Sequence, residues 1–231
     1  MVETSESQAQ PQYPVTIWEA IAITVGAVLL VAIGLAGLVY KFFGNAADPQ
    51  RAFLISRSLM DYQLPGAVQG VFGANLGGAK VAIVSSSSFL KDPAKLTEAE
   101  VANLSGAELF IARVPLDVET AVTPTPSPPE SPPAQPTDLF SSPDFSFSYR
   151  SGEDFRVIST RTQELRFCYN TVPVRIQTGE LTLYAELPPV YAVKYDAVAI
   201  FDNSKRQVTV TAIGAKAEKQ AAGVFNSLRC K

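Results

Sequence analysis

The run from Ala20 to Tyr40, AIAITVGAVLLVAIGLAGLVY, contains no charged residue and no proline. An α-helix rises about 1.5 Å per residue, so about 20 apolar residues cross a hydrocarbon core about 30 Å thick. The run is apolar on every face, which the core helix of a soluble protein does not require. We therefore predict one membrane-spanning helix over residues 15–43, with a soluble part after it.

The flanks of this run favour an uncleaved anchor over a cleaved signal peptide. Trp18 precedes the run, and Tyr40, Phe42 and Phe43 close it, as in the aromatic belts of membrane spans. A signal peptide begins with basic residues and has a short apolar core. The residues before Ala20 include three glutamates and neither lysine nor arginine. Residues 1–14 are polar and are expected to form a disordered tail.

Two features bear on which side of the membrane holds the soluble part. Lys41, Arg51 and Arg57 follow the span, and such an excess of basic residues is typical of the cytoplasmic side. Cys168 and Cys230 either form a disulfide, which implies the periplasm or a lumen, or are buried free thiols. The basic flank narrowly favours free thiols and a cytoplasmic domain. With either alternative, we expect the two sulfurs to lie near one another or to be buried.

The residues after the span show patterns of short helices and strands. Asp48 and Pro49 suit the N-cap and first position of a helix that runs to about Tyr62. A second, shorter helix is predicted over Thr97–Leu104, because Thr97 and Glu100 have the spacing of a capping box. The strand-like runs of this half are Ala67–Ala74, Lys80–Ser85 and Glu108–Val114, with a hairpin turn over Asn75–Gly78.

The last third of the chain is rich in alternating apolar and polar residues. The predicted strands are Val172–Gln177, Leu181–Tyr184, Tyr191–Phe201 and Val208–Ala212, with turns at Thr178-Gly179 and Asp202–Lys205. A helix over Ala215–Leu228 follows, because Ala217, Ala221, Val224, Phe225 and Leu228 form one apolar stripe. We therefore predict an α+β fold: one N-terminal transmembrane helix, then a mainly antiparallel sheet with a C-terminal helix packed on one face.

Residues 117–144 interrupt this pattern with a proline-rich stretch of almost no large apolar residues. We predict that they form a flexible insertion, a spacer in preference to a ligand for a proline-binding domain. The soluble domain then has two parts, residues 44–116 and 145–231. Since the first part is too small to bury a core alone, both parts are expected to share one sheet.

The sequence shows no pattern of known chemistry. The chain has no histidine, which excludes Ser-His-Asp catalysis and histidine-ligated metals, and two thiols alone do not make a zinc site. In the glycine-rich stretch Gly73–Lys80 the lysine falls one residue late for a phosphate-binding loop, and Val81 replaces the hydroxyl residue. The carboxylates Asp61, Glu108, Asp154 and Asp196 are isolated in sequence. We predict no catalytic residue, no cofactor-binding residue, no metal ligand and no cofactor.

The charge of the last third of the chain does not indicate a nucleic-acid partner. Residues Phe145 to Lys231 include twelve basic and eight acidic residues, but the basic residues are scattered along the sequence, so no nucleic-acid partner is expected.

The stretches Ser58–Val84 and Val224–Cys230 resemble a group of cyanobacterial single-pass membrane proteins of unknown function. The resemblance implies a plasma or thylakoid membrane and transfers no functional residue.

The expected function is that of a membrane-tethered accessory or interaction module, such as a subunit of a membrane complex. Its expected partners are the lipid bilayer and a protein in the membrane. The alternative is a small-ligand-binding or enzymatic domain that uses the face of the sheet.

Overall fold

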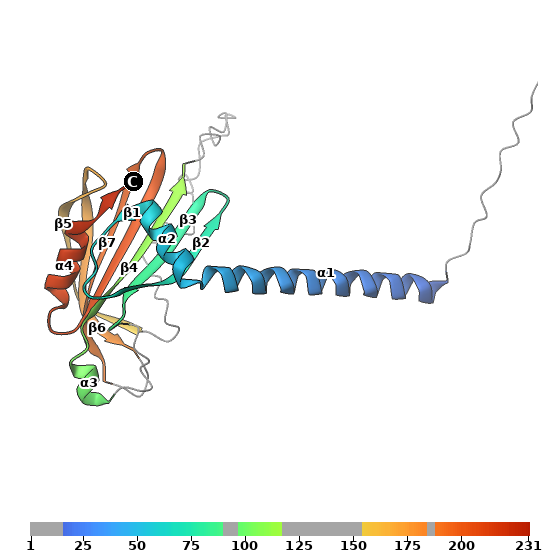
Figure 1. Cartoon of the computed structure of the whole chain (residues 1–231), viewed down its shortest axis with the longest axis horizontal. Coiled ribbons are helices and arrows are strands. Elements are labelled where there is room, and N and C mark those ends of the chain that lie inside the picture. Colours follow the sequence, from blue (N-terminus) through green and yellow to red (C-terminus); the bar gives the residue numbers. More distant parts are fainter. Residues whose placement is uncertain (1–15, 90–96, 117–153, 184–187) are drawn as a thin grey trace, which may run out of the picture. The chain divides into compact units, whose positions relative to one another are not determined.

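The computed structural model describes residues 16–89, 97–116, 154–183 and 188–231 (Figure 1). The predicted tail over residues 1–14 and the predicted insertion over residues 117–144 lie outside the described residues. The chain forms two compact units, Met1–Gly44 and Asn45–Lys231.

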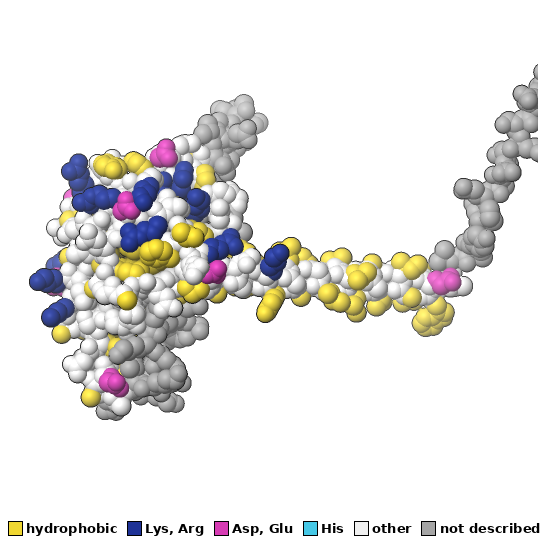
Figure 2. All heavy atoms as spheres, in the orientation of Figure 1, with side chains coloured by type: hydrophobic (Ala, Val, Ile, Leu, Met, Phe, Trp, Pro, Cys, Tyr) yellow, Lys and Arg dark blue, Asp and Glu magenta, His cyan; other side chains and the backbone are white. Residues whose placement is uncertain are grey.

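The first unit contains most of helix α1 (Ile17–Ala46), and apolar side chains cover its surface (Figure 2). In the described part of the chain, α1 is the helix that is long and apolar enough to cross a membrane. Length and composition alone support this, and a signal sequence near the N-terminus meets the same criteria. The predicted span over residues 15–43 thus corresponds to a helix that begins at Ile17 in the described residues.

The second unit is built on one antiparallel sheet of seven strands. Across the sheet, the strands follow the order β2 (Val68–Leu76), β3 (Ala79–Ser86), β4 (Gly106–Pro115), β8 (Ser204–Ile213), β7 (Val190–Phe201), β6 (Asn170–Thr182) and β5 (Asp154–Phe167). The two parts of the domain meet where β4 pairs with β8, with Leu109 opposite Val210. The predicted α+β fold and the predicted sharing of one sheet are both confirmed.

Two helices cover one face of this sheet. Helix α2 (Pro49–Leu59) packs on β2 and β3, and α4 (Ala217–Ser227) packs on β7 and β8. Their apolar sides join the inward side chains of the strands in one buried core. Phe225 of α4 is 1% exposed, and its ring centroid lies 5.6 Å from that of Tyr195 and 6.0 Å from that of Phe167. This confirms the prediction of a C-terminal helix packed on one face.

The local signals at helix ends and at one turn are also confirmed. The Asp48 carboxylate accepts hydrogen bonds from the backbone amides of Gln50 and Arg51 and caps α2. The short helix α3 (Glu98–Ala102) starts with the predicted capping box. Gly77 and Gly78, with φ of 56° and 89°, form the turn between β2 and β3, a conformation that glycine adopts without strain.

Two sequence predictions about element ends and turns are wrong. Helix α2 ends at Leu59 and not near Tyr62, because β1 (Met60–Asp61) pairs there with the C-terminal β9 (Arg229–Cys230). No turn occurs at Thr178-Gly179, since β6 continues through both residues. Gly179 lies beside an irregularity of β5, where a Cβ atom would collide with the carbonyl oxygen of Arg156.

Strand β5 is absent from the strands that the sequence predicts. It is an edge strand, and its residues from Arg156 to Glu164 are exposed. An edge strand with two solvated sides has no alternation of apolar and polar residues, so periodicity does not reveal it. The predicted strand Leu181–Tyr184 falls partly outside the described residues.

Candidate functional site

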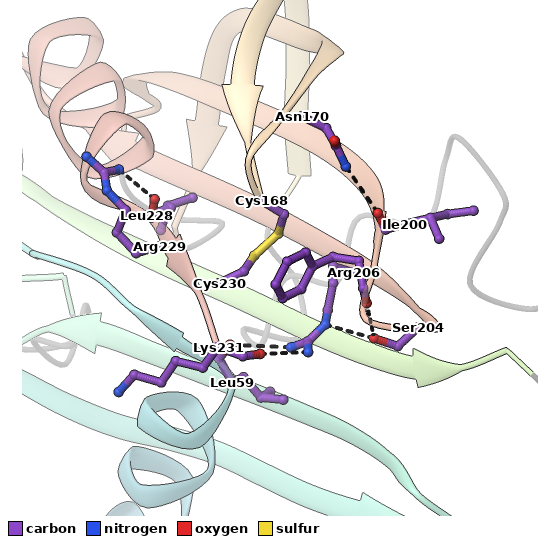
Figure 3. Close-up of a disulfide and its surroundings, with 11 residues drawn as sticks. Leu59, Cys168, Asn170, Ile200, Ser204, Arg206, Leu228, Arg229, Cys230 and Lys231 are labelled. Atoms are coloured by element: carbon purple, nitrogen blue, oxygen red, sulfur yellow. Dashed lines mark hydrogen bonds between the residues drawn. A yellow bond between two sulfur atoms is a disulfide. The ribbon is translucent and has the colours of Figure 1, made fainter.

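The ends of the two covering helices meet around a disulfide. Cys168 lies in the turn between β5 and β6, and Cys230 lies in β9; the structure joins them in a disulfide with Cα atoms 5.1 Å apart (Figure 3). The expected proximity of the two sulfurs is confirmed, whereas the narrowly favoured free thiols are not what the structure contains. The two cysteines meet because of the tertiary structure. Helix α4 packs on the sheet and ends beside the tip of the β5–β6 hairpin, so that Cys230 lies next to Cys168.

The turn that carries Cys168 has an unusual backbone. Cys168 and Tyr169 have φ of 49° and 66°, a left-handed conformation that is costly for residues other than glycine, asparagine and aspartate. Neighbouring contacts hold it, because the Tyr169 ring lies 5.6 Å from the Phe201 ring and the Asn170 amide donates to the Ile200 carbonyl. Together with the disulfide, these contacts fix the hairpin tip against the end of β7.

A buried arginine ties the same region to the sheet. Arg206 of β8 is 1% exposed, and its guanidinium donates to the Ser204 hydroxyl at 3.0 Å and to the carbonyl oxygens of Leu59 at 3.3 Å and Lys231 at 2.8 Å (Figure 3). Burial lowers the pKa of Arg206, but guanidinium groups stay protonated in proteins. The side chain therefore holds the end of α2 and the C-terminal segment on one strand.

Replacing Arg206 with lysine is expected to lower the free energy of unfolding by about 2–3 kcal/mol. An ammonium group does not reproduce the three directions of a guanidinium, so buried carbonyl oxygens lose their donors. Denaturant unfolding of the full chain in mild detergent measures the change. Arg156→Lys, at a side chain that is 81% exposed on β5, is the control and should change stability by less than about 0.5 kcal/mol. Equal midpoints for both variants would contradict the role of Arg206.

Two adjoining cavities flank this tied region. One has a volume of about 750 Å³ and lies between the end of α2, β1 and the end of α4; the other, of about 280 Å³, lies against the disulfide. Asn226 and Arg229 line both cavities, while Arg57 lines the larger and Arg166 the smaller. We call these four residues and the space between them the arginine groove.

The structure orients two of the groove arginines. The Arg57 guanidinium lies over the Tyr62 ring at 4.3 Å and donates to the Tyr62 carbonyl oxygen at 3.2 Å. Arg229 donates to the carbonyl oxygens of Asn226 and Leu228, at 2.9 and 2.7 Å, where the dipole of α4 favours a cation. The Tyr62 hydroxyl shares a 2.7 Å hydrogen bond with Ser56, and burial raises its pKa, so it stays neutral.

The charge of the groove is positive. Asp61 is the one acidic residue among the described residues that line the two cavities, and its carboxylate pairs with the Lys231 ammonium at 2.7 Å. Lysine and arginine side chains gather on this face of the domain, over the region where Figure 1 places β1, α2 and β7 (Figure 2). Guanidinium groups held in this way are suited to carboxylate or phosphate ligands.

A second polar cluster lies on the opposite face of the sheet. Asp196 accepts a 2.7 Å hydrogen bond from the Thr209 hydroxyl and lies 3.5 Å from the Arg175 guanidinium and 3.9 Å from the Lys194 ammonium. Glu108 is buried on the same face, where the register aligns it with Lys194 through Thr211. Of the carboxylates that are isolated in sequence, the fold thus brings Glu108 and Asp196 to one face and leaves Asp61 in the groove. The Asp154 side chain lies outside the described atoms.

Because of Lys194, the free energy of unfolding of the domain is expected to change with pH in the alkaline range. Burial lowers its pKa below the ordinary 10.5, although Asp196 opposes the shift. Between the lowered value and 10.5 the unfolded chain binds more protons, so the free energy of unfolding rises with pH across that window. Unfolding of wild type and Lys194→Met between pH 8 and 10 tests this, and the methionine variant should lack the rise. Identical slopes would contradict a depressed pKa, and Lys219→Met, at an exposed position of α4, is the control.

Comparisons with known proteins yield no relative: no family model, no curated protein and no solved structure matches the chain. Within the described residues, no group of three histidine, cysteine, aspartate or glutamate side chains could hold a metal ion. Sequence reasoning pointed to Cys168 and Cys230 but not to the groove arginines. No local signal could have found them, because Arg57, Arg166 and Arg229 are far apart in sequence.

Proposed function

We propose that this chain is a membrane-tethered accessory module that serves as a subunit of a membrane complex. In this proposal α1 is the anchor, the α+β domain is the recognition unit, and the arginine groove is the recognition surface. The observation that carries the proposal is the orientation of Arg57 and Arg229 by carbonyl oxygens and an aromatic ring at an open groove. Preoriented guanidinium groups lose little conformational freedom on binding, which favours recognition.

Purification from native membranes after mild cross-linking tests this function. The wild-type chain should retain a membrane protein partner, and a variant with Arg57, Arg166 and Arg229 changed to glutamate should lose it. Arg156→Glu is the matched control, because Arg156 is exposed on β5 and does not line the groove. Migration of the wild-type chain alone in mild detergent, under conditions that keep other membrane complexes intact, would contradict the proposal.

We also propose that the domain lies on the oxidising side of the membrane, in the periplasm or a lumen. The disulfide supports this side, since disulfides persist mainly in oxidising compartments. It outweighs the three basic residues after the span, a small excess by the standard of most cytoplasmic flanks. If the resemblance to cyanobacterial membrane proteins holds, the membrane is the plasma or the thylakoid membrane.

Thiol labelling and proteolysis of right-side-out vesicles test the side. For a domain outside the vesicle, external protease should cleave it, and both cysteines should react with a thiol reagent after reduction and denaturation but not before reduction. Labelling without reductant, together with resistance to external protease, would place the domain in the cytoplasm. That result would restore the prediction made from the basic flank.

The alternative function is binding of a small ligand, or catalysis, on the other face of the sheet. The buried cluster around Asp196 and Lys194 favours it, because paired charges in a low dielectric can recognise polar ligands. A metabolite that raises the melting temperature of wild type and of Arg229→Glu, but not of Asp196→Asn, would support this alternative.

A further inference from the structure

We infer that the arginine groove binds the phosphate headgroups of anionic lipids in the membrane that holds α1. This inference rests on the proposed function, because it names a ligand for the same recognition surface. It requires that a phosphate fits the groove chemically, that the groove can reach the bilayer, and that neighbouring side chains suit a lipid surface.

The chemistry of the groove suits a phosphate. Arg229 lines both cavities, the larger one together with Arg57 and the smaller one together with Arg166. Guanidinium groups bind phosphate oxygens in pairs through parallel N–H donors, and the Asn226 side chain adds a further polar group. The larger cavity, about 750 Å³, has the size of sites that take small molecules. The Asp61 carboxylate would repel an anion, but its charge is offset by the ion pair with the Lys231 ammonium.

The chain length keeps the groove near the bilayer. Thirteen residues lead from Gly44, the end of the first unit, to Arg57, and nine of them lie in α2. Helical residues advance 1.5 Å and extended ones at most about 3.6 Å, so Arg57 lies within about 28 Å of Gly44. A tether of this length gives headgroups a high effective concentration at the groove. Lipid headgroups surround a membrane anchor at all times, whereas a protein partner must first be encountered, and this is why we choose the lipid.

An exposed apolar residue on α2 also suits a lipid surface. Leu54 of α2 is 69% exposed and precedes Arg57 by one helical turn, while Arg51 precedes Leu54 by another. Basic and apolar side chains on one helical stripe are typical of helices that lie in the membrane interface. Each arginine near an anionic surface is attracted to it, and this attraction falls off within a Debye length.

Hydrogen exchange of the full chain in lipid nanodiscs tests the inference. We compare discs of phosphatidylcholine alone with discs that also contain phosphatidylglycerol, and follow peptides that cover Arg57–Gln63 and Gly223–Lys231. The anionic discs should slow exchange of these peptides severalfold, and high salt should remove the effect. Arg229→Glu and Arg166→Glu should abolish it, and Arg156→Glu should keep it. Arg166 is exposed, so its reversal leaves the fold intact even if the other variant is unstable.

Equal exchange in both kinds of disc would overturn the inference. Equal slowing in neutral discs to which inorganic phosphate or soluble glycerol phosphate is added would assign the groove to a free phosphate ligand and would overturn it as well. Slowing that appears only when solubilised membrane proteins are added would assign the groove to the protein partner alone and would overturn the lipid as its ligand. Failure here is distinct from failure of the accessory function, because partner purification with the groove variants does not depend on the lipid.

Discussion

Changing Phe225 to aspartate is expected to unfold the domain. The side chain is 1% exposed and packs against Phe167 and Tyr195 at the centre of the helix-covered face. Loss of a buried phenyl group costs about 3–5 kcal/mol, and an unpaired carboxylate at the same place adds several more. The sum is comparable to the 5–15 kcal/mol by which domains are stable. Limited proteolysis and circular dichroism of the full chain in detergent measure the result.

Phe225→Leu separates the effect of charge from that of volume. Leucine leaves a smaller side chain in the same apolar site, so a cost of about 1–2 kcal/mol and a folded domain are expected. If the aspartate variant resists protease as well as wild type, Phe225 does not pack on the sheet, and the arrangement of α4 would be wrong.

Removing the disulfide has the second largest expected effect. The double change Cys168→Ala and Cys230→Ala opens a loop closed by residues 62 apart in sequence. The chain-entropy model assigns about 4 kcal/mol to a loop of this length. The denaturation midpoint of the full chain should fall accordingly, and backbone amides of Arg229 and Cys230 should exchange faster because β9 loses its covalent link.

The disulfide prediction carries its own controls. Each single alanine variant should match the double variant, since either change removes the same bond. Reductant should lower the midpoint of wild type and leave the double variant unchanged. A wild-type midpoint that does not respond to reductant would show that the purified chain lacks the bond.

The disulfide and the hydrogen bonds of Arg206 both support the arginine groove. Arg229 belongs to β9, which the disulfide attaches to the β5–β6 hairpin and the Arg206 guanidinium holds through the Lys231 carbonyl. The ribbon of β1 and β9 has only two residues in each strand, too few to be stable alone. Loss of either tie should therefore loosen the groove before it affects the sheet.

Local patterns in the sequence were sufficient for much of the fold. The apolar run of α1, the stripe on α4, the capping residues of α2 and α3, and the hairpin of β7 and β8 are all correct because each depends on residues close together in the chain. Helix caps, apolar periods of 3.6 residues and strand alternation depend only on residues that are close together in the sequence. They can therefore be recognised without knowledge of the tertiary structure.

Long-range packing decided the remainder. Gly179 reads as a turn residue, but the close approach of the Arg156 carbonyl makes it a strand residue. The cysteine pair depends on α4 crossing the sheet, and the groove brings Arg57, Arg166 and Arg229 together from three distant segments. Such contacts follow from how strands are ordered in the sheet and where helices cover it, which no short window of sequence encodes. Composition and periodicity thus establish an anchored α+β domain, and only the packed structure assembles the surface to which we assign its function.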